Sequence, residues 1–296
     1  MILTYFPKTC PPPGWPNLVI HARSREIDYP EHAGPLSLKS VFRGEEIHQV
    51  SGVRYAVDKS SVLLLNHGRP YSSHIRSGEE VETFSIFFER SFAAKTLRCL
   101  TETEDRLLDD PTVCGSQPVE FFETMYPRSP GLATLLIEMR DQTELNRHEP
   151  IWLEERLHQV LAQLLLDHLD LVARSEALTA VRATTRIEQY RRLLTARDFI
   201  EGNLGGAIDL PKISAASCLS SFHLLRLFKE AFEETPHQYL TRRRLERARD
   251  LLAGTALPVW EIGQRVGYES LSSFSRLVSK RYGTSPRGLR RRSAAS

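Results

Sequence analysis

The alternation of apolar and polar residues changes its period along the chain. Between about Leu36 and Glu89, short runs rich in β-branched and aromatic residues are separated by Gly, Asn or Pro. These runs are SLKSVFRG, EIHQVSG, RYAVDKSS, SVLLLNHGRP and EVETFSIFFE. The pattern predicts a small antiparallel barrel or sandwich. The Pro-rich residues 1–34 have no clear period and predict an irregular arm or a first edge strand.

After Pro111 the period becomes helical. One helix is expected after Ser129 and Pro130, and a stronger one from about Trp152 to Ala173. The apolar stripe of the second helix repeats at i, i+3, i+4 and i+7, through Leu153, Leu157, Val160, Leu161, Leu164, Leu165, His168 and Val172. Two interpretations of this stripe stay open: it covers the barrel, or its width also serves a dimer interface.

Small and polar residues interrupt the helical pattern over about residues 174–185 and predict an interdomain linker. The residues that follow have helical periodicity without strand signals. We therefore expect an α+β multidomain protein, with a first domain over residues 1–173 and an all-α domain over residues 186–296.

An internal duplication lies in the helical half. The segment from Ile213 to Pro236 matches the segment from Ile262 to Pro286. Each copy has an apolar start, a turn, a Ser-rich stretch and an apolar-x-Arg-x-apolar core, with one extra residue before the core in the second copy. Each copy is therefore a candidate helix-turn-helix.

Helical geometry gives each second helix of the repeat two faces. In the first copy the inward face carries Leu224, Leu227, Phe228 and Ala231. The outward face of that helix carries Phe222, Leu225, Arg226 and Lys229. In the second copy Phe274, Leu277 and Val278 point inward. Its outward residues are Ser272, Ser275, Arg276 and Ser279.

The outward residues suit DNA recognition. Arg226 and Arg276 can each pair with guanine O6 and N7, and Phe222 and Leu225 can contact thymine methyl groups. Lys229 is better suited to phosphate. Alternatively, the two arginines form ion pairs within the protein, with Glu230 or Glu269 for example.

The N-termini of the two outward-facing helices are further candidate sites for phosphate. Ser220 and Ser270 are N-cap candidates, so the helices after them would point free N–H groups at phosphate.

Formal charge supports a polyanion partner for the helical half. The net charge of the whole chain is +2, but 19 basic and 26 acidic residues precede residue 186, and 20 basic and 11 acidic residues follow from there. The two parts thus carry −7 and +9, a division typical of a nucleic-acid-binding module joined to a domain with another role.

A helix rich in arginine is expected between the two copies, in PHQYLTRRRLERARDLLAGT. Its apolar stripe would pack inward, and at about 24 Å it would hold two recognition helices about one DNA turn apart. The remaining surface is crowded by Arg242, Arg243, Arg244, Arg247 and Arg249. Their single sign favours phosphate contact over a merely solvated face.

These residues resemble the AraC/XylS family of bacterial transcription regulators over roughly residues 185–292. The motifs are the LxRxFK core from Leu224, TPHQYL, RRRLERARDLL, LPVWEIGQRVGY and GTSPRGLRR, in the family's order and spacing. Two departures are Cys218, where Gly is common, and Val278, where an aromatic residue is usual.

The resemblance implies two helix-turn-helix subdomains that bind adjacent major-groove segments of double-stranded DNA. With the outward faces it gives the expected DNA-binding residues Ser221, Phe222, Leu225, Arg226, Lys229, Leu271, Ser272, Ser275, Arg276 and Ser279.

For the front half the resemblance implies a regulatory, cupin-like β barrel that binds a small-molecule effector and dimerises through helices. The expected effector-binding residues are His67, Tyr71, His74 and Arg76, although lone His and Tyr residues near strand ends are commonly ordinary turn or core residues. The expected partners are DNA, an effector, RNA polymerase and a second copy of the chain. Activation and repression are not distinguished by the residues.

Neither catalysis nor a cofactor is expected. The front half has His48, His67 and His74 but no HxH pair, which argues against a metal-dependent cupin enzyme. The four cysteines have no zinc spacing and suit a reducing compartment. With no signal-peptide pattern or apolar run long enough for a membrane span, we expect a cytoplasmic protein. A constitutive DNA-binding factor without an effector is the main alternative.

Overall fold

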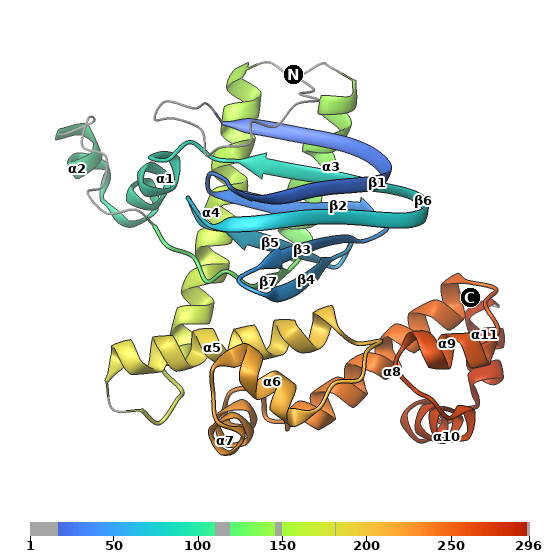
Figure 1. Ribbon diagram of the computed structural model, residues 1–296. Coiled ribbons are helices and arrows are strands. Elements are labelled where there is room, and N and C mark those ends of the chain that lie inside the picture. Colours follow the sequence, from blue (N-terminus) through green and yellow to red (C-terminus); the bar gives the residue numbers. More distant parts are fainter. Residues whose placement is uncertain (1–16, 110–118, 146–149, 181, 295–296) are drawn as a thin grey trace. The chain divides into compact units, whose positions relative to one another are not determined.

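The computed structural model of the protein describes residues 17–109, 119–145, 150–180 and 182–294, and it divides the chain into two compact units, 1–176 and 177–296 (Figure 1). The N-terminal unit combines a β barrel with helices. The C-terminal unit is helical throughout its described residues. This is the fold class that the sequence predicts.

The barrel is built around one long strand. Strand β6 (Pro70–Phe87) pairs antiparallel with β1 (Leu18–Ala33), β2 (Ser37–Arg43) and β3 (Glu46–Val50). Strands β4 (Val53–Val57), β5 (Ser61–Leu65) and β7 (Met125–Pro127) complete the order β4-β3-β6-β2-β5-β7, with β1 also on β6. The result is a nearly closed antiparallel barrel (Figure 1).

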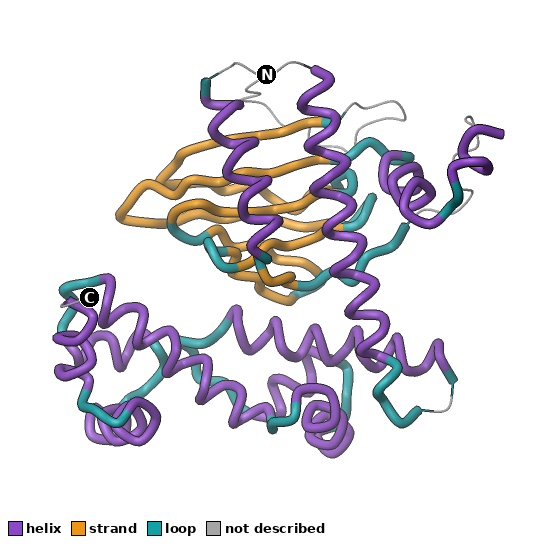
Figure 2. The backbone as a smooth tube through the Cα atoms, turned by 180° about the vertical axis from the view of Figure 1, so that it is seen from behind, coloured by secondary structure: helices purple, strands orange, loops and turns teal. Residues whose placement is uncertain are grey.

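Burial along the strands explains this shape. Val53, Tyr55 and Val57 of β4 are buried in strict alternation, as a strand with one solvated face requires. Strands β2 and β5 are buried on both faces over most of their length. Figure 2 shows helices lying across the outside of the barrel.

The first strand is longer than the sequence indicates. Within the Pro-rich stretch that predicts an arm or an edge strand, β1 runs for 16 residues, but Val19 is its one buried residue. Its position is set by backbone pairing with β6, with register shifts after Ser24 and Tyr29. Backbone pairing of this kind leaves no hydrophobic period in a sequence.

Helices α1 (Phe92–Thr101), α2 (Glu104–Asp109), α3 (Pro130–Glu144) and α4 (Pro150–Ser175) belong to the N-terminal unit. Helix α3 begins where expected, because the side chain of Ser129 accepts a hydrogen bond from Leu132 N at 3.3 Å. The predicted stripe of α4 is buried at Leu157, Val160, Leu161, Leu164 and Leu165. It therefore packs within its own unit, while a dimer interface stays a prediction.

The C-terminal unit contains α5 (Ala183–Gly202), α6 (Leu210–Ser217), α7 (Ser221–Phe232), α8 (Pro236–Gly254), α9 (Val259–Arg265), α10 (Leu271–Tyr282) and α11 (Pro286–Ala294). Helix α4 continues to Ser175 and α5 begins at Ala183, so helix extends into both ends of the segment 174–185. Among the described residues no helix is long and apolar enough to cross a membrane.

Substituting Leu164→Ala should lower the free energy of unfolding of the N-terminal unit by about 2–5 kcal/mol, because this fully buried side chain would leave a cavity beside the barrel. Ile151→Ala is the matched control in the same helix: its side chain is 78% exposed, and about 0.5 kcal/mol or less should be lost. Urea unfolding would measure both, and equal losses would contradict this assignment of the faces of α4.

Candidate nucleic-acid interface

The first helix-turn-helix consists of α6, a short turn and α7. Asp209 begins α6 by accepting a hydrogen bond from Lys212 N at 2.9 Å. Cys218 ends α6 with φ at 52°, in the left-handed region where glycine is favoured. Ser220 then begins α7, its side chain accepting from His223 N at 3.3 Å. The N-cap predicted at Ser220 is confirmed.

Helix α7 has the two predicted faces. Leu224, Leu227 and Phe228 are buried, whereas Phe222 and Leu225 are 74% and 40% exposed. Phe222 and Leu225 are three residues apart, so they are neighbours on the outward side of α7. Arg226 and Lys229 are exposed on the same side.

The second helix-turn-helix repeats this arrangement with α9 and α10. Gly267 makes the turn with φ at 82°, and the side chain of Ser270 begins α10 by accepting from Ser273 N at 3.4 Å. Phe274 and Val278 are fully buried in a core that includes residues of α8 and α9. The outward residues Leu271, Ser272, Arg276 and Ser279 are exposed.

Two of the expected contact residues are less available than the others. Ser221 is half-buried, and its Oγ lies 3.1 Å from the Oγ of Ser214 in α6. Ser275 is also half-buried. For Ser221 the cause is its contact with α6, which an angular position on a helix does not reveal.

Arg226 and Arg276 are free of ion pairs within the described part of the chain. Glu230, an alternative partner for Arg226, instead accepts a hydrogen bond from Thr179 N at 2.7 Å. Two guanidinium groups at equivalent places in the duplicated helices are thus exposed without a carboxylate. They can bind an external acceptor.

Figures 1 and 2 show α7 and α10 nearly end-on and on the same side of the C-terminal unit, with α8 running between them. Helix α8 has 19 residues and begins with a capping box formed by Thr235 and Gln238. At 1.5 Å per residue it is about 28 Å long. The exposed faces of both helices can therefore meet one extended partner.

Most of the arginines of α8 serve the protein itself, contrary to the phosphate role that their single sign favours. Arg242 pairs with Glu234 and Glu246 at 2.7 and 3.1 Å. Arg243 pairs with Glu201 and Glu246 at 2.6 and 2.7 Å. The hydrogen bonds that Arg242 donates to Glu234 are the main cause that raises the pKa of Arg242. Glu201 comes from α5, Glu234 from the turn before α8 and Glu246 from α8 itself, so the run of arginines alone does not reveal these partners.

A buried polar network lies beneath these pairs. Asp198 is fully buried and accepts from Arg197 Nη2 at 2.9 Å. The Tyr239 hydroxyl donates to Glu201 Oε1 at 2.5 Å, and burial followed by the charge of Glu201 raises the pKa of Tyr239. The network joins α5 to the start of α8 and so fixes the first helix-turn-helix on the helix that leads to the second.

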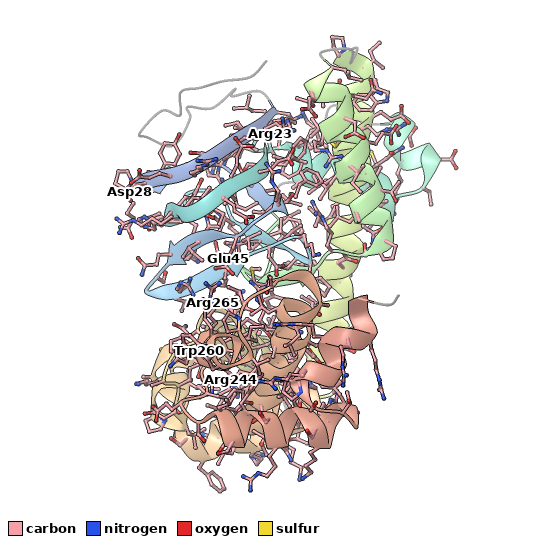
Figure 3. The ribbon with its side chains drawn as sticks, turned by 90° about the vertical axis from the view of Figure 1, so that its right-hand side faces the viewer. Arg23, Asp28, Glu45, Arg244, Trp260 and Arg265 are labelled. Atoms are coloured by element: carbon pink, nitrogen blue, oxygen red, sulfur yellow. The ribbon has the colours of Figure 1, made fainter. Side chains whose placement is uncertain are left out.

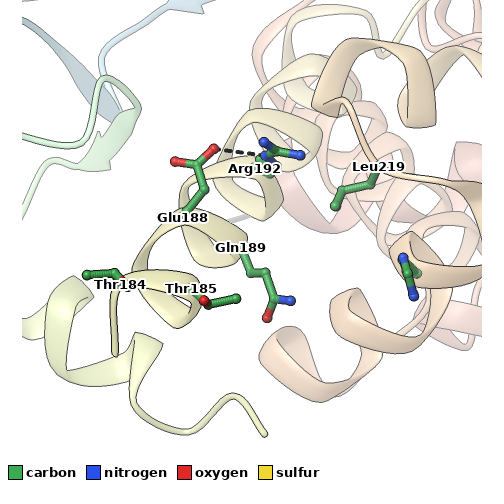
Figure 4. Close-up of a pocket in the computed structure, with 7 residues that line it drawn as sticks. Thr184, Thr185, Glu188, Gln189, Arg192 and Leu219 are labelled. Carbon is green, nitrogen blue, oxygen red and sulfur yellow. Dashed lines mark hydrogen bonds and ion pairs between the residues drawn. The ribbon is translucent and has the colours of Figure 1, made fainter. Parts of the chain in front are cut away.

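A groove of about 470 Å³ opens beside the first helix-turn-helix, between α5 and the turn before α7 (Figure 4). Arg192 crosses it, pairing with Glu188 at 2.8 Å and donating to the carbonyl of Cys218 at 3.0 Å. His223 of α7 also lines the groove. The contact with Cys218 holds the turn in its left-handed conformation.

The expected effector residues are spread over the N-terminal unit. Tyr71 is buried, but His67 and Arg76 are exposed. His74 Nδ1 lies 2.6 Å from Oδ1 of Asp28, a residue labelled in Figure 3, and is half-exposed. The structure does not bring these four residues together. The reason is that β6 starts at Pro70, so alternation along the strand turns neighbouring residues to opposite faces.

Tyr71 instead belongs to a buried polar cluster that we define as Lys39, Glu46, His48, Tyr71 and Ser73. Lys39 Nζ donates to the Tyr71 hydroxyl at 2.9 Å and lies 4.0 Å from the centre of the Phe87 ring. Burial lowers the pKa of Lys39 to about 7, against the opposing effect of Glu46. Ser73 Oγ lies 2.8 Å from His48 Nδ1.

Two atoms of this buried polar cluster have unmet hydrogen-bonding capacity. Glu46 Oε2 and His48 Nε2 are buried 3.4 Å apart, and neither makes a hydrogen bond. Sequence analysis missed Lys39 and Glu46, although their charge at alternating positions of apolar strands is a usable signal. The described residues contain no group of three or more His, Cys, Asp or Glu arranged to hold a metal ion.

Comparison with known proteins adds to this geometry. The helix-turn-helix domain family model matches residues 213–292. The chain is 30% identical to the probable transcriptional regulator LumQ of Photobacterium leiognathi over 151 residues, which cover 45% of this chain and 59% of LumQ. That match therefore spans less than two thirds of LumQ.

Two further likenesses differ in how much of the chain they cover. The HTH-type transcriptional activator RhaS of Yersinia pseudotuberculosis is 24% identical over 275 residues, covering 92% of this chain and 93% of RhaS. A solved AraC-type transcriptional regulator from Chromobacterium violaceum is 28% identical, with 38% of this chain and 97% of that chain covered and a TM-score of 0.34.

Substituting Asp198→Asn should destabilise the C-terminal unit by about 3–5 kcal/mol, because it leaves the Arg197 guanidinium without its buried counter-charge. Asp250→Asn is the control, since Asp250 pairs with Arg249 at an exposed site and should change stability by about 0.5 kcal/mol or less. Thermal and urea unfolding would compare the two. Similar effects would contradict a stabilising role for the buried pair.

Proposed function

We propose that the protein is a transcription regulator of the AraC/XylS family that binds a specific DNA site, because residues 213–292 match the helix-turn-helix domain model and the chain is similar over 92% of its length to the activator RhaS. We further propose that a small effector bound in the N-terminal barrel controls it. The chain spans 59% of LumQ, so the activity of the whole protein is our inference from its own residues.

The observation that carries this proposal is the repeated, unpaired arginine. Arg226 and Arg276 occupy equivalent positions on α7 and α10, and both are exposed next to other outward residues. A guanidinium donates two parallel hydrogen bonds to guanine O6 and N7 in the major groove. Both helices also begin at a serine cap, where free N–H groups favour a phosphate.

The two reading faces differ in chemistry. Helix α7 offers the apolar Phe222 and Leu225 beside Arg226, which suits thymine methyl groups next to guanine. Helix α10 offers Leu271, Ser272 and Arg276, a mixed surface. One copy of the protein should therefore read a direct, asymmetric site, and any palindrome would arise from dimerisation.

Selection of duplexes from a random library by the full chain tests this function and defines the site. The chain should enrich one sequence with two parts about one DNA turn apart. The enriched duplex should bind about a thousandfold or more tighter than random DNA at moderate salt. Equal binding to both would reject the proposal that the protein is a sequence-specific regulator.

Substituting Arg226→Ala or Arg276→Ala should each weaken binding to the selected duplex by about 1–3 kcal/mol and relax specificity at one base pair. Lys229→Ala should instead weaken binding to all sequences and reduce the salt dependence, because it contacts phosphate. Arg249→Ala, which removes a side chain paired with Asp250, is the control. Uniform weakening by the Arg226 and Arg276 substitutions would reassign them to the DNA backbone.

Effector control rests on the buried polar cluster. Glu46 Oε2 and His48 Nε2 are buried 3.4 Å apart and face each other without a hydrogen bond, so a ligand or water that bonds to them would be stabilised there. Tyr71, the one expected effector residue that is buried, lies in this cluster.

We also propose two protein partners, a second copy of the chain and RNA polymerase. The second copy would bind through Leu166 and Leu169, which are exposed on α4.

Lys39→Met should abolish the response to an effector while leaving DNA binding intact, since Lys39 lies in the N-terminal unit. The measurement is operator affinity of the full chain with and without metabolites that raise its melting temperature. Lys59→Met, at an exposed position of the same unit, is the control and should keep the response. If no metabolite changes operator affinity of the wild type, the protein is a constitutive factor.

A further inference from the structure

One arginine of α8 differs from its neighbours in what it contacts. Arg244 Nε donates to the carbonyl of Leu204 at 2.8 Å, and its Nη2 donates to the carbonyl of Gly206 at 2.6 Å. Both carbonyls belong to the loop after α5, in the first helix-turn-helix subdomain. The same guanidinium lies 5.6 Å from the centre of the Tyr268 ring, in the turn between α9 and α10 of the second subdomain. Arg244 is labelled in Figure 3, as is Arg265, which lies three residues before Tyr268.

The two subdomains meet closely at this point. A Cβ atom on Gly267 would lie 2.5 Å from Arg244 Nη2 and 2.8 Å from the carbonyl oxygen of Leu204. A Cβ atom on Gly205 would lie 2.6 Å from the carbonyl oxygen of Arg265. Glycine is therefore required on both sides of the contact, and at Gly267 the φ of +82° requires it as well.

Arg244 has a different kind of partner from Arg242 and Arg243. Those two arginines bind carboxylates, whereas Arg244 contacts two carbonyl oxygens and an aromatic ring. Its guanidinium is half-buried, and burial lowers its pKa. The two hydrogen bonds offset the cost of removing the guanidinium from water, because its planar fork of donors holds both acceptors in a fixed geometry.

From these contacts we infer that Arg244 sets the distance and rotation between α7 and α10, and thereby makes the spacing of the two half-sites part of the DNA specificity. The inference rests on the proposed function. Arg244 is a positioning residue in this account: it contacts no base, and it acts through the loop of residues 203–206 and the turn of residues 265–268.

The expected consequence follows from DNA geometry. One added base pair between the half-sites moves one of them by about 3.4 Å and turns it by roughly 35° around the helix axis. Rigidly joined recognition helices cannot follow both changes, so one of them loses its base contacts. Loosely joined helices can adapt, at some cost in affinity for the native spacing.

The experiment compares the duplex selected by the full chain with the same duplex carrying one extra base pair between its halves. Wild type should lose about tenfold or more in affinity on the longer duplex, the value of one good base contact or more. Arg244→Ala should bind the native duplex more weakly but lose about threefold or less on the longer one. Gly267→Ala, which crowds Arg244 and the Leu204 carbonyl, should relax the spacing in the same direction.

Controls separate this inference from a general loss of structure or function. Arg249→Ala on the same helix should keep the wild-type spacing preference, since Arg249 pairs with Asp250. If Arg244→Ala weakens both duplexes equally, Arg244 merely supports the fold and the inference is rejected. If wild type selects no duplex at all, the proposed function fails first, a result distinct from both.

A measurement without DNA keeps the inference testable even if a variant loses all affinity. Spin labels at His223→Cys on α7 and Arg281→Cys on α10, both exposed, report the distance between the helices in the full chain with its native cysteines changed to serine. Wild type should give one narrow distance distribution. Arg244→Ala should broaden it, and Arg244→Lys should broaden it too, because an ammonium lacks the planar fork. An unchanged narrow distribution in Arg244→Ala would overturn the inference.

Discussion

Helix α8 supplies apolar side chains to two hydrophobic cores, and the arrangement of the C-terminal unit depends on that sharing. Near its start the ring of Tyr239 packs edge to face against Phe228 of α7, with centroids 5.7 Å apart. Near its end Leu245, Ala248 and Leu252 join Phe274 and Val278 of α10. Because both recognition helices are packed on one continuous helix, α8 keeps them within one unit and limits how far their outward faces can move apart.

Charge in this unit serves two purposes that composition cannot separate. Asp198, Glu201, Glu234 and Glu246 neutralise arginines within the unit, and the pair between Glu201 and Arg243 joins α5 to α8. What remains for a polyanion is the smaller set of unpaired cations on the outward faces, Arg226 and Arg276 among them. The excess of positive charge therefore overstates the number of groups that can face DNA, and ion pairing decides which ones do.

The N-terminal barrel contains charged side chains in an apolar interior. Lys39, Glu46 and His48 are buried where strands otherwise contribute Val, Leu and Phe. A fold that needed packing alone would be more stable with apolar residues at these positions. The proposed binding role of the barrel gives a reason for their presence, and these residues lie in a different unit from the outward residues of α7 and α10.

Local sequence determined most strands of the barrel, the helices from Pro130 onward and the outward faces of the two recognition helices. The spacing of Leu224 and Phe228 in α7, and of Phe274 and Val278 in α10, predicts which side of each helix is buried, because a helix repeats every 3.6 residues. Tertiary structure alone decided the rest: β1 is positioned by pairing with a strand some 50 residues away, and the arginines of α8 find partners on α5 and on the turns around them. Such contacts join residues distant in the chain, so no local pattern records them.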